Sequence, residues 1–121
     1  MQRPLLITLI VPTFLILAAS NALAVDPAVE NIVKTMDEKA REGKADEVLA
    51  DAKARVARAD TAANRYLLGR AYGLAREYEK ARVEFERVLE RDIRSPLGYH
   101  GLGAYFFSKR DVEAAEKNFR K

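Results

Sequence analysis

Cysteine is absent from the 121-residue chain, and histidine occurs once, at position 100. Without cysteine, no disulfide, thiolate metal site or lipid-modified N-terminal cysteine can form. A zinc site of two or three histidines is excluded as well, because His100 has no second imidazole beside it. No glycine-rich phosphate-binding loop is present, and nothing in the pattern buries the carboxylates, so we expect them to keep their ordinary acidity. The sequence therefore predicts no catalytic residues, no metal, no cofactor and no enzymatic activity.

A surplus of charge of one sign is also missing. The chain has 21 lysines and arginines against 18 aspartates and glutamates, which gives a net charge of +3, and both signs are mixed along its length. A nucleic-acid-binding surface needs a basic stripe with interleaved aromatic residues, and no such stripe occurs. The charges indicate a solvated outer surface, and no nucleic-acid partner is expected.

The only long apolar run of the sequence lies at its start, before Val25. Met1-Gln2-Arg3 precedes an apolar run from Leu5 to Ala19, and Ala22-Leu23-Ala24 follows it, which is the layout of a signal peptide cleaved after Ala24. The run is short for a bilayer, which needs roughly 20 residues. The alternative is an uncleaved anchor, because residues 4–24 contain few polar residues and proline is tolerated in membrane helices.

Both readings of the leader place the rest of the chain outside the cytoplasm. The alanine- and arginine-rich segments that follow favour a bacterial envelope protein. We therefore expect an exported, periplasmic protein, with a membrane-anchored form facing the periplasm as the alternative. A membrane contact is expected only through the N-terminal segment, if it is uncleaved.

Six positions of the chain recur at one constant offset. The matched residues, each followed by its counterpart, are Leu68 and Leu102, Gly69 and Gly103, Tyr72 and Phe106, Tyr78 and Val112, Ala81 and Ala115, and Phe85 and Phe119. The two members of each pair are separated by the same number of residues. A period of about 34 residues is typical of stacked repeats, in which each unit buries the apolar face of its neighbour. Spacings of three and four residues within each unit predict two antiparallel helices. Glycine disfavours a helix by about 1 kcal/mol relative to alanine, so we expect close packing of a neighbouring helix at Gly69 and Gly103.

This pattern resembles the tetratricopeptide repeat (TPR), whose unit of about 34 residues carries Leu-Gly-x2-Tyr in its first helix and Ala-x3-Phe in its second. The resemblance implies an all-α fold, namely a right-handed superhelical stack of antiparallel helix pairs (a TPR-like solenoid) preceded by the signal peptide. The chain departs from the family pattern at three positions. Arg65 stands where an aromatic residue is usual, Val88 where alanine is usual and Ile93 where proline is frequent.

The repeat pattern and the helix signals divide the chain into four segments. Asp26-Pro27 is a helix start signal and Gly43 a stop signal, so residues 25–60 are expected to form a divergent helix pair after the signal peptide of residues 1–24. The resemblance implies one TPR over residues 61–95 and another over residues 96–121, whose second helix is expected to be incomplete. Phe119 is therefore expected to face nothing in this chain. Either the natural chain is longer, or a partner or a second copy covers that edge.

The resemblance also implies a ligand groove lined by the first helix of each repeat. The candidate partner-binding residues carried over to this chain are Tyr66, Arg70, Leu74, Leu97, His100 and Phe107. Helical spacing alone places Tyr66, Arg70 and Leu74 on one face. An aromatic and apolar strip with one fixed cation is suited to an extended or helical peptide whose carboxylate meets Arg70.

Each of these residues has a structural alternative. Tyr66 and Phe107 would then fill the interface between repeats, Arg70 would be a solvated charge, and His100 would be a neutral interface residue rather than a pH switch. The predicted function is an exported scaffold that binds a protein or peptide partner in assembly of envelope machinery. The alternatives are a self-associating structural module, which forms a homo-oligomer, and the recruiting domain of a longer enzyme.

Overall fold

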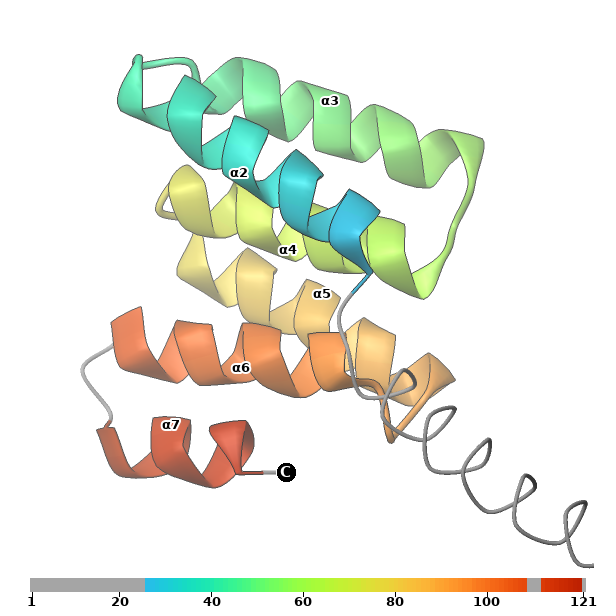
Figure 1. Ribbon diagram of the computed structural model, residues 1–121, viewed down its shortest axis with the longest axis vertical. Coiled ribbons are helices and arrows are strands. Elements are labelled where there is room, and N and C mark those ends of the chain that lie inside the picture. The colour runs from blue at the N-terminus through green and yellow to red at the C-terminus, as the bar shows by residue number, and fades with distance from the viewer. Residues whose placement is uncertain (1–25, 109–111, 121) are drawn as a thin grey trace, which may run out of the picture.

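The computed structural model describes residues 26–108 and 112–120, and for residues 112–115 it describes the backbone alone. Every regular element in these residues is a helix, which confirms the prediction of an all-α fold (Figure 1). The six helices are α2 (Pro27–Arg41), α3 (Ala45–Arg58), α4 (Ala62–Leu74), α5 (Tyr78–Arg91), α6 (Pro96–Ser108) and α7 (Val112–Phe119). None of the helices in the described ranges is long and apolar enough to cross a bilayer.

Both ends of α2 and the start of α4 lie where the local chemistry of the sequence places them. The Asp26 carboxylate accepts a hydrogen bond of 2.9 Å from the backbone N–H of Ala28, with Pro27 as the first helical residue. Gly43, at φ 81°, lies between α2 and α3 in the left-handed region that glycine adopts without strain. The hydroxyl of Thr61 accepts a hydrogen bond of 3.1 Å from the backbone of Asn64 and caps α4. The signal peptide predicted for residues 1–24 lies outside the described residues.

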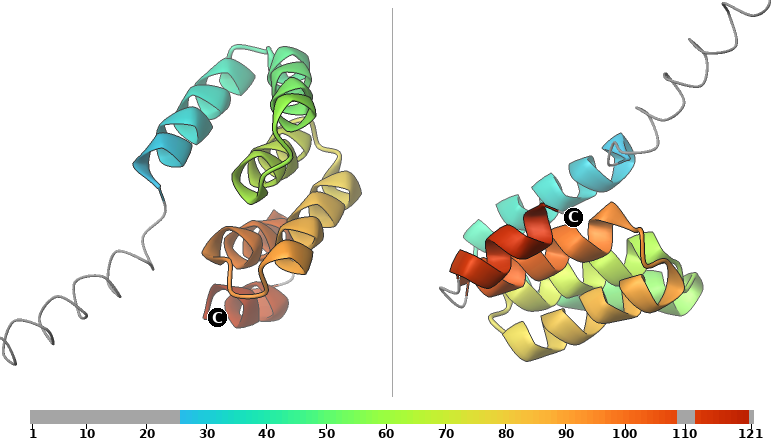
Figure 2. Two further views of the ribbon diagram at one scale, coloured as in Figure 1. Left: turned by 90° about the vertical axis from the view of Figure 1, so that its right-hand side faces the viewer. Right: turned by 90° about the horizontal axis from the view of Figure 1, so that it is seen from below.

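The helices pack in consecutive order. Each described helix contacts the next one along the chain, and α4 also contacts both α2 and α6. Figures 1 and 2 show α2, α4 and α6 toward one side of the molecule, with α3 and α5 behind them. Both α4 and α6 have 13 residues. The start and the end of α6 follow those of α4 at the same offset that separates Leu68 from Leu102, so α4 and α6 are equivalent helices.

The core between α4, α5 and α6 is built around Phe85, which is 3% exposed. A Cβ added at Gly69 would lie 2.4 Å from a ring carbon of Phe85, and one added at Gly101 would lie 2.2 Å from another. The ring therefore fits between two helix backbones because both positions lack a side chain. Close packing at Gly69 was expected from the sequence, whereas the part played by Gly101 was not.

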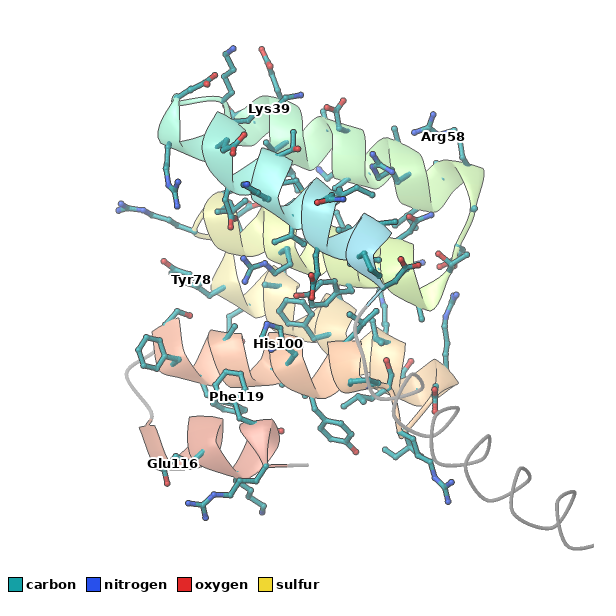
Figure 3. The ribbon with its side chains drawn as sticks, in the orientation of Figure 1. Lys39, Arg58, Tyr78, His100, Glu116 and Phe119 are labelled. Atoms are coloured by element: carbon teal, nitrogen blue, oxygen red, sulfur yellow. The ribbon has the colours of Figure 1, made fainter. Side chains whose placement is uncertain are left out.

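Phe119 does not face empty space, contrary to the expectation from the sequence. Its ring lies over α6, where a Cβ added at Gly103 would come within 2.7 Å of it. The centroids of the Phe119 and His100 rings are 5.7 Å apart (Figure 3). The ring is still 51% exposed.

Among the residues that the structure describes, the carboxylate of Glu84 is buried, which corrects the expectation that the pattern buries none. Glu84 is 4% exposed and accepts hydrogen bonds of 3.0 Å from Arg65 and 2.7 Å from Arg87. Arg65 also binds both carboxylate oxygens of Asp60, at 2.7 and 3.0 Å. The hydrogen bonds from Arg65 have the largest effect on the pKa of the Asp60 carboxyl, and those from Arg91 come next. Together they hold this pKa well below its usual range. Arg65 thus links the start of α4 to α5.

Replacing Arg65 by methionine is expected to lower the free energy of unfolding by about 1–3 kcal/mol, because buried Glu84 loses one of its two partners. Urea denaturation followed by circular dichroism measures the change. The control is Arg82→Met, whose side chain pairs with Glu79 and Glu86 on the surface. A much smaller change is expected for the control, and equal losses in the two variants would contradict the buried ion pair.

Acid provides a second readout of the same ion pairs. Because the folded-state pKa of Asp60 is lowered, its contribution to stability is present above the ordinary value of 3.8 and is lost as the pH falls toward the folded value. The difference in stability between the wild type and Arg65→Met is therefore expected to narrow below pH 3.8. If the difference in stability between the two proteins widens below that pH, the ion pair between Arg65 and Asp60 does not stabilise the fold as described.

Candidate functional site

Two hollows open between the helices of the central part of the molecule. The α2 hollow has a volume of about 300 Å³ and lies between α2, α4 and α6. Its lining residues are Val29, Glu30, Val33, Lys34, Asp37, Tyr66, Arg70 and His100. The α5 hollow has a volume of about 250 Å³ and lies between α4, α5 and α6. Its lining residues are Gly69, Arg70, Gly73, Leu74, Tyr78, Ala81, Phe85, Ala104, Tyr105 and Ser108.

Small residues keep the α5 hollow open. A Cβ added at Gly73 would meet nothing within 4 Å, in contrast to one at Gly69, one turn earlier. Ala81 and Phe85 are 2% and 3% exposed, so they form the floor of the hollow. The remaining apolar lining includes Leu74 from α4. The α5 hollow is therefore an apolar depression with one charged residue, Arg70, in its lining.

Arg70 is the residue that the two hollows share. Its Nη2 atom donates to a carboxylate oxygen of Asp37 at 3.5 Å, which is the long limit of a hydrogen bond. Its Nε atom is buried, and no described residue accepts a hydrogen bond from it. The side chain as a whole is 24% exposed. A guanidinium has five N–H donors, so this positive charge is largely removed from water with only one weak partner among the described residues.

An aromatic row borders the α2 hollow. Ring centroids are 5.8 Å apart for Phe85 and Tyr66, 6.3 Å for Tyr66 and His100, and 5.7 Å for His100 and Phe119. Burial lowers the pKa of His100, and the positive charge of Arg70 lowers it further. Burial also raises the pKa of Tyr66. Both side chains are therefore neutral at pH 7, and the positive charges in the lining of the α2 hollow are those of Arg70 and Lys34.

The structure brings together part of the set that the sequence nominated. Tyr66, Arg70 and His100 line the α2 hollow, and Arg70 and Leu74 line the α5 hollow. Tyr66 is 4% exposed, so most of its ring belongs to the core and only an edge reaches the hollow. Leu97 is partly buried against the core, and Phe107 is 66% exposed; neither lines a hollow.

Sequence reasoning missed the contribution of α2. Val29, Val33 and Asp37 follow one another at intervals of four residues and face α4 and α6 across the α2 hollow. This periodicity was a usable signal, because such spacing places side chains on one helix face. The acceptor for Arg70 therefore came from a helix that carried no candidate residue.

No group of three or more histidine, aspartate or glutamate side chains within the described ranges could hold a metal ion. The chain matches no family model, and no curated protein or solved structure is significantly similar to it. The fold and the site therefore show only the class of protein. It is an all-helical protein of consecutively packed helices, with two apolar hollows on either side of an arginine.

Proposed function

We propose that the protein is an exported scaffold of the TPR type that binds a peptide or protein partner noncovalently between α2, α4 and α6. The constant offset between equivalent residues supports the repeat assignment, as do the contacts of α4 with both α2 and α6. In this proposal the helix pairs form a right-handed superhelical stack, and the two hollows lie along its ligand groove.

The observation that carries the proposal is the position of Arg70 between the two apolar hollows. Binding sites in proteins are mostly apolar depressions in which a few polar groups fix the orientation of the ligand. The free energy of a protein interface comes mainly from a few anchor side chains seated in such pockets. Two hollows offer two places for anchors, and Arg70 offers one place for a carboxylate.

The location and the role follow from the leader. In this proposal a signal peptide, or an uncleaved anchor, delivers the helices to the periplasm, and assembly of envelope machinery is the role that the resemblance to TPR proteins implies there. The proposal contains no chemical step, no cofactor and no nucleic acid. It allows a membrane contact only through the N-terminal segment.

A second candidate function is self-association. In the described part of the chain, α7 contacts α6 alone, and Phe119 is half exposed. A second copy that covers this edge would build a dimer or a filament, depending on whether the contact closes on itself.

Site-specific photocrosslinking in native cells tests both functions. A photoreactive amino acid at Lys34 or at Ser108, which line the α2 and α5 hollows, is expected to crosslink to one partner protein. The control position is Arg58, which is exposed at the end of α3 (Figure 3). Equal crosslinking from Arg58 would contradict groove binding, and crosslinks to the same chain alone would establish self-association in its place.

A further inference from the structure

We infer that the partner segment carries an aspartate or glutamate between two large apolar residues, with one apolar side chain in each hollow and the carboxylate on Arg70. The inference rests on the proposed function and names the chemistry of the partner that the same site would recognise. Three features of the site lead to it: the unsatisfied guanidinium, the distribution of charge and the size of the hollows.

The guanidinium of Arg70 has unused capacity for hydrogen bonds. Its contact with Asp37 is 3.5 Å long, whereas a well-formed hydrogen bond between guanidinium and carboxylate is about 2.7–2.9 Å. The buried Nε atom has no acceptor among the described residues, so water does not compensate the charge from that side. The side chain retains 24% exposure, through which a ligand can reach it. A carboxylate is the acceptor that matches the planar, forked geometry of arginine.

The charges around Arg70 decide from which side the carboxylate arrives. In the α2 hollow Asp37 already accepts a hydrogen bond from Arg70, and Glu30 and Lys34 carry opposite charges in the same lining. The α5 hollow contains no charged lining residue except Arg70. At neutral pH His100 adds no positive charge, because burial and Arg70 lower its pKa. The carboxylate of the ligand therefore approaches Arg70 from the α5 hollow.

Each hollow has room for one large apolar side chain. Their volumes are about 300 and 250 Å³, and an apolar cavity of about 150 Å³ is enough for a benzene molecule. Val29, Val33 and an edge of Tyr66 offer apolar contact in the α2 hollow. Leu74 and the ring of Phe85 do so in the α5 hollow.

The order of these groups selects a peptide as the ligand. The cation lies between the two apolar hollows, so the ligand must present a carboxylate between two apolar groups. A fatty acid carries its carboxylate at one end and satisfies only one side. A peptide presents such a series as successive side chains, which is how grooves in proteins recognise extended and helical segments.

Selection from a displayed library of random dodecapeptides tests this inference, with the full 121-residue chain as the target. Enriched peptides are expected to contain aspartate or glutamate flanked on both sides by large apolar residues. Selection on the Arg70→Gln variant is expected to retain the apolar residues and to lose the acidic one. For the best peptide, exchange of its acidic residue for the matching amide is expected to weaken binding about tenfold to the wild type and to leave binding to Arg70→Gln unchanged.

Two further variants keep the test decisive if Arg70→Gln folds poorly. Asp37→Asn removes the residue that competes for Arg70, so it is expected to tighten binding of the acidic peptide severalfold. Gly73→Leu places a side chain in the open space of the α5 hollow and is expected to weaken binding about tenfold. Circular dichroism melts of all variants report whether the fold is retained.

The outcomes separate this inference from the proposed function. Enriched peptides that lack an acidic residue, or an acid preference that survives Arg70→Gln, would overturn the inference and leave groove binding intact. Affinity for the acidic peptide that Asp37→Asn does not raise would also count against it. The absence of any enriched peptide would also overturn the inference, and equal crosslinking from Arg58 would overturn groove binding as well.

Discussion

Replacing Phe85 by alanine is expected to lower the free energy of unfolding by about 3–5 kcal/mol, the usual range for a fully buried phenylalanine. The ring is 3% exposed and fills the space between the backbones of α4 and α6 at Gly69 and Gly101. Neither glycine has a side chain that can move into the cavity left behind. A domain of this size is stable by about 5–15 kcal/mol in total, so much of the native stability would be lost.

The matched control is Phe119→Ala, the same substitution at the equivalent position of the following unit. Phe119 is 51% exposed, so its removal takes away less buried apolar surface and leaves no closed cavity. We expect a loss of about 1 kcal/mol. Urea denaturation of both variants provides the comparison, and similar losses would show that Phe85 is not the centre of the core.

Alanine substitutions at Gly69 and Gly73 are expected to change stability in opposite directions, although both positions lie in α4 one turn apart. At Gly69 the added Cβ would lie 2.4 Å from the ring of Phe85, and the overpacking should destabilise the protein by about 1–3 kcal/mol. At Gly73 nothing lies within 4 Å of the added Cβ. Alanine there is expected to stabilise the protein by about 0.4–1 kcal/mol, because it restricts the unfolded chain and favours the helix.

Thermal melts followed by circular dichroism check this pair of variants. Each kcal/mol shifts the melting temperature by about 4–8 °C in a domain of this size, so the two midpoints should move apart on either side of the wild type. Combining Gly69→Ala with Phe85→Leu provides a control, since a smaller side chain at position 85 relieves the clash. A destabilising Gly73→Ala would contradict the open space of the α5 hollow.

Both ends of α2 were predictable because the interactions that cause them are local. Asp26 caps a helix whose first residue is Pro27, and Gly43 ends the same helix through a conformation that few other residues adopt. These interactions join residues close together in the chain, so the sequence displays them directly. The all-α fold class followed from the same kind of signal, repeated along the chain.

The candidate site was predictable in part. The spacing of Tyr66, Arg70 and Leu74 places them along one side of α4, and each lines one of the two hollows or both. The acceptor of Arg70, however, is Asp37, which belongs to α2 and lies far away in the sequence. No periodicity within α4 could reveal it. Phe107 had the same helical spacing as the other candidates, yet it lies outside both hollows.

By itself, the sequence determined where α2 begins and ends, the all-α class and the constant offset between equivalent positions. Capping, proline and glycine act over a few residues, which is why these features were predictable. Only the tertiary structure decided that Glu84 is buried between two arginines, that Gly101 admits the ring of Phe85 and that two apolar hollows flank Arg70. Each of these depends on contacts between separate helices, whose relative positions are set by the packing of the whole core.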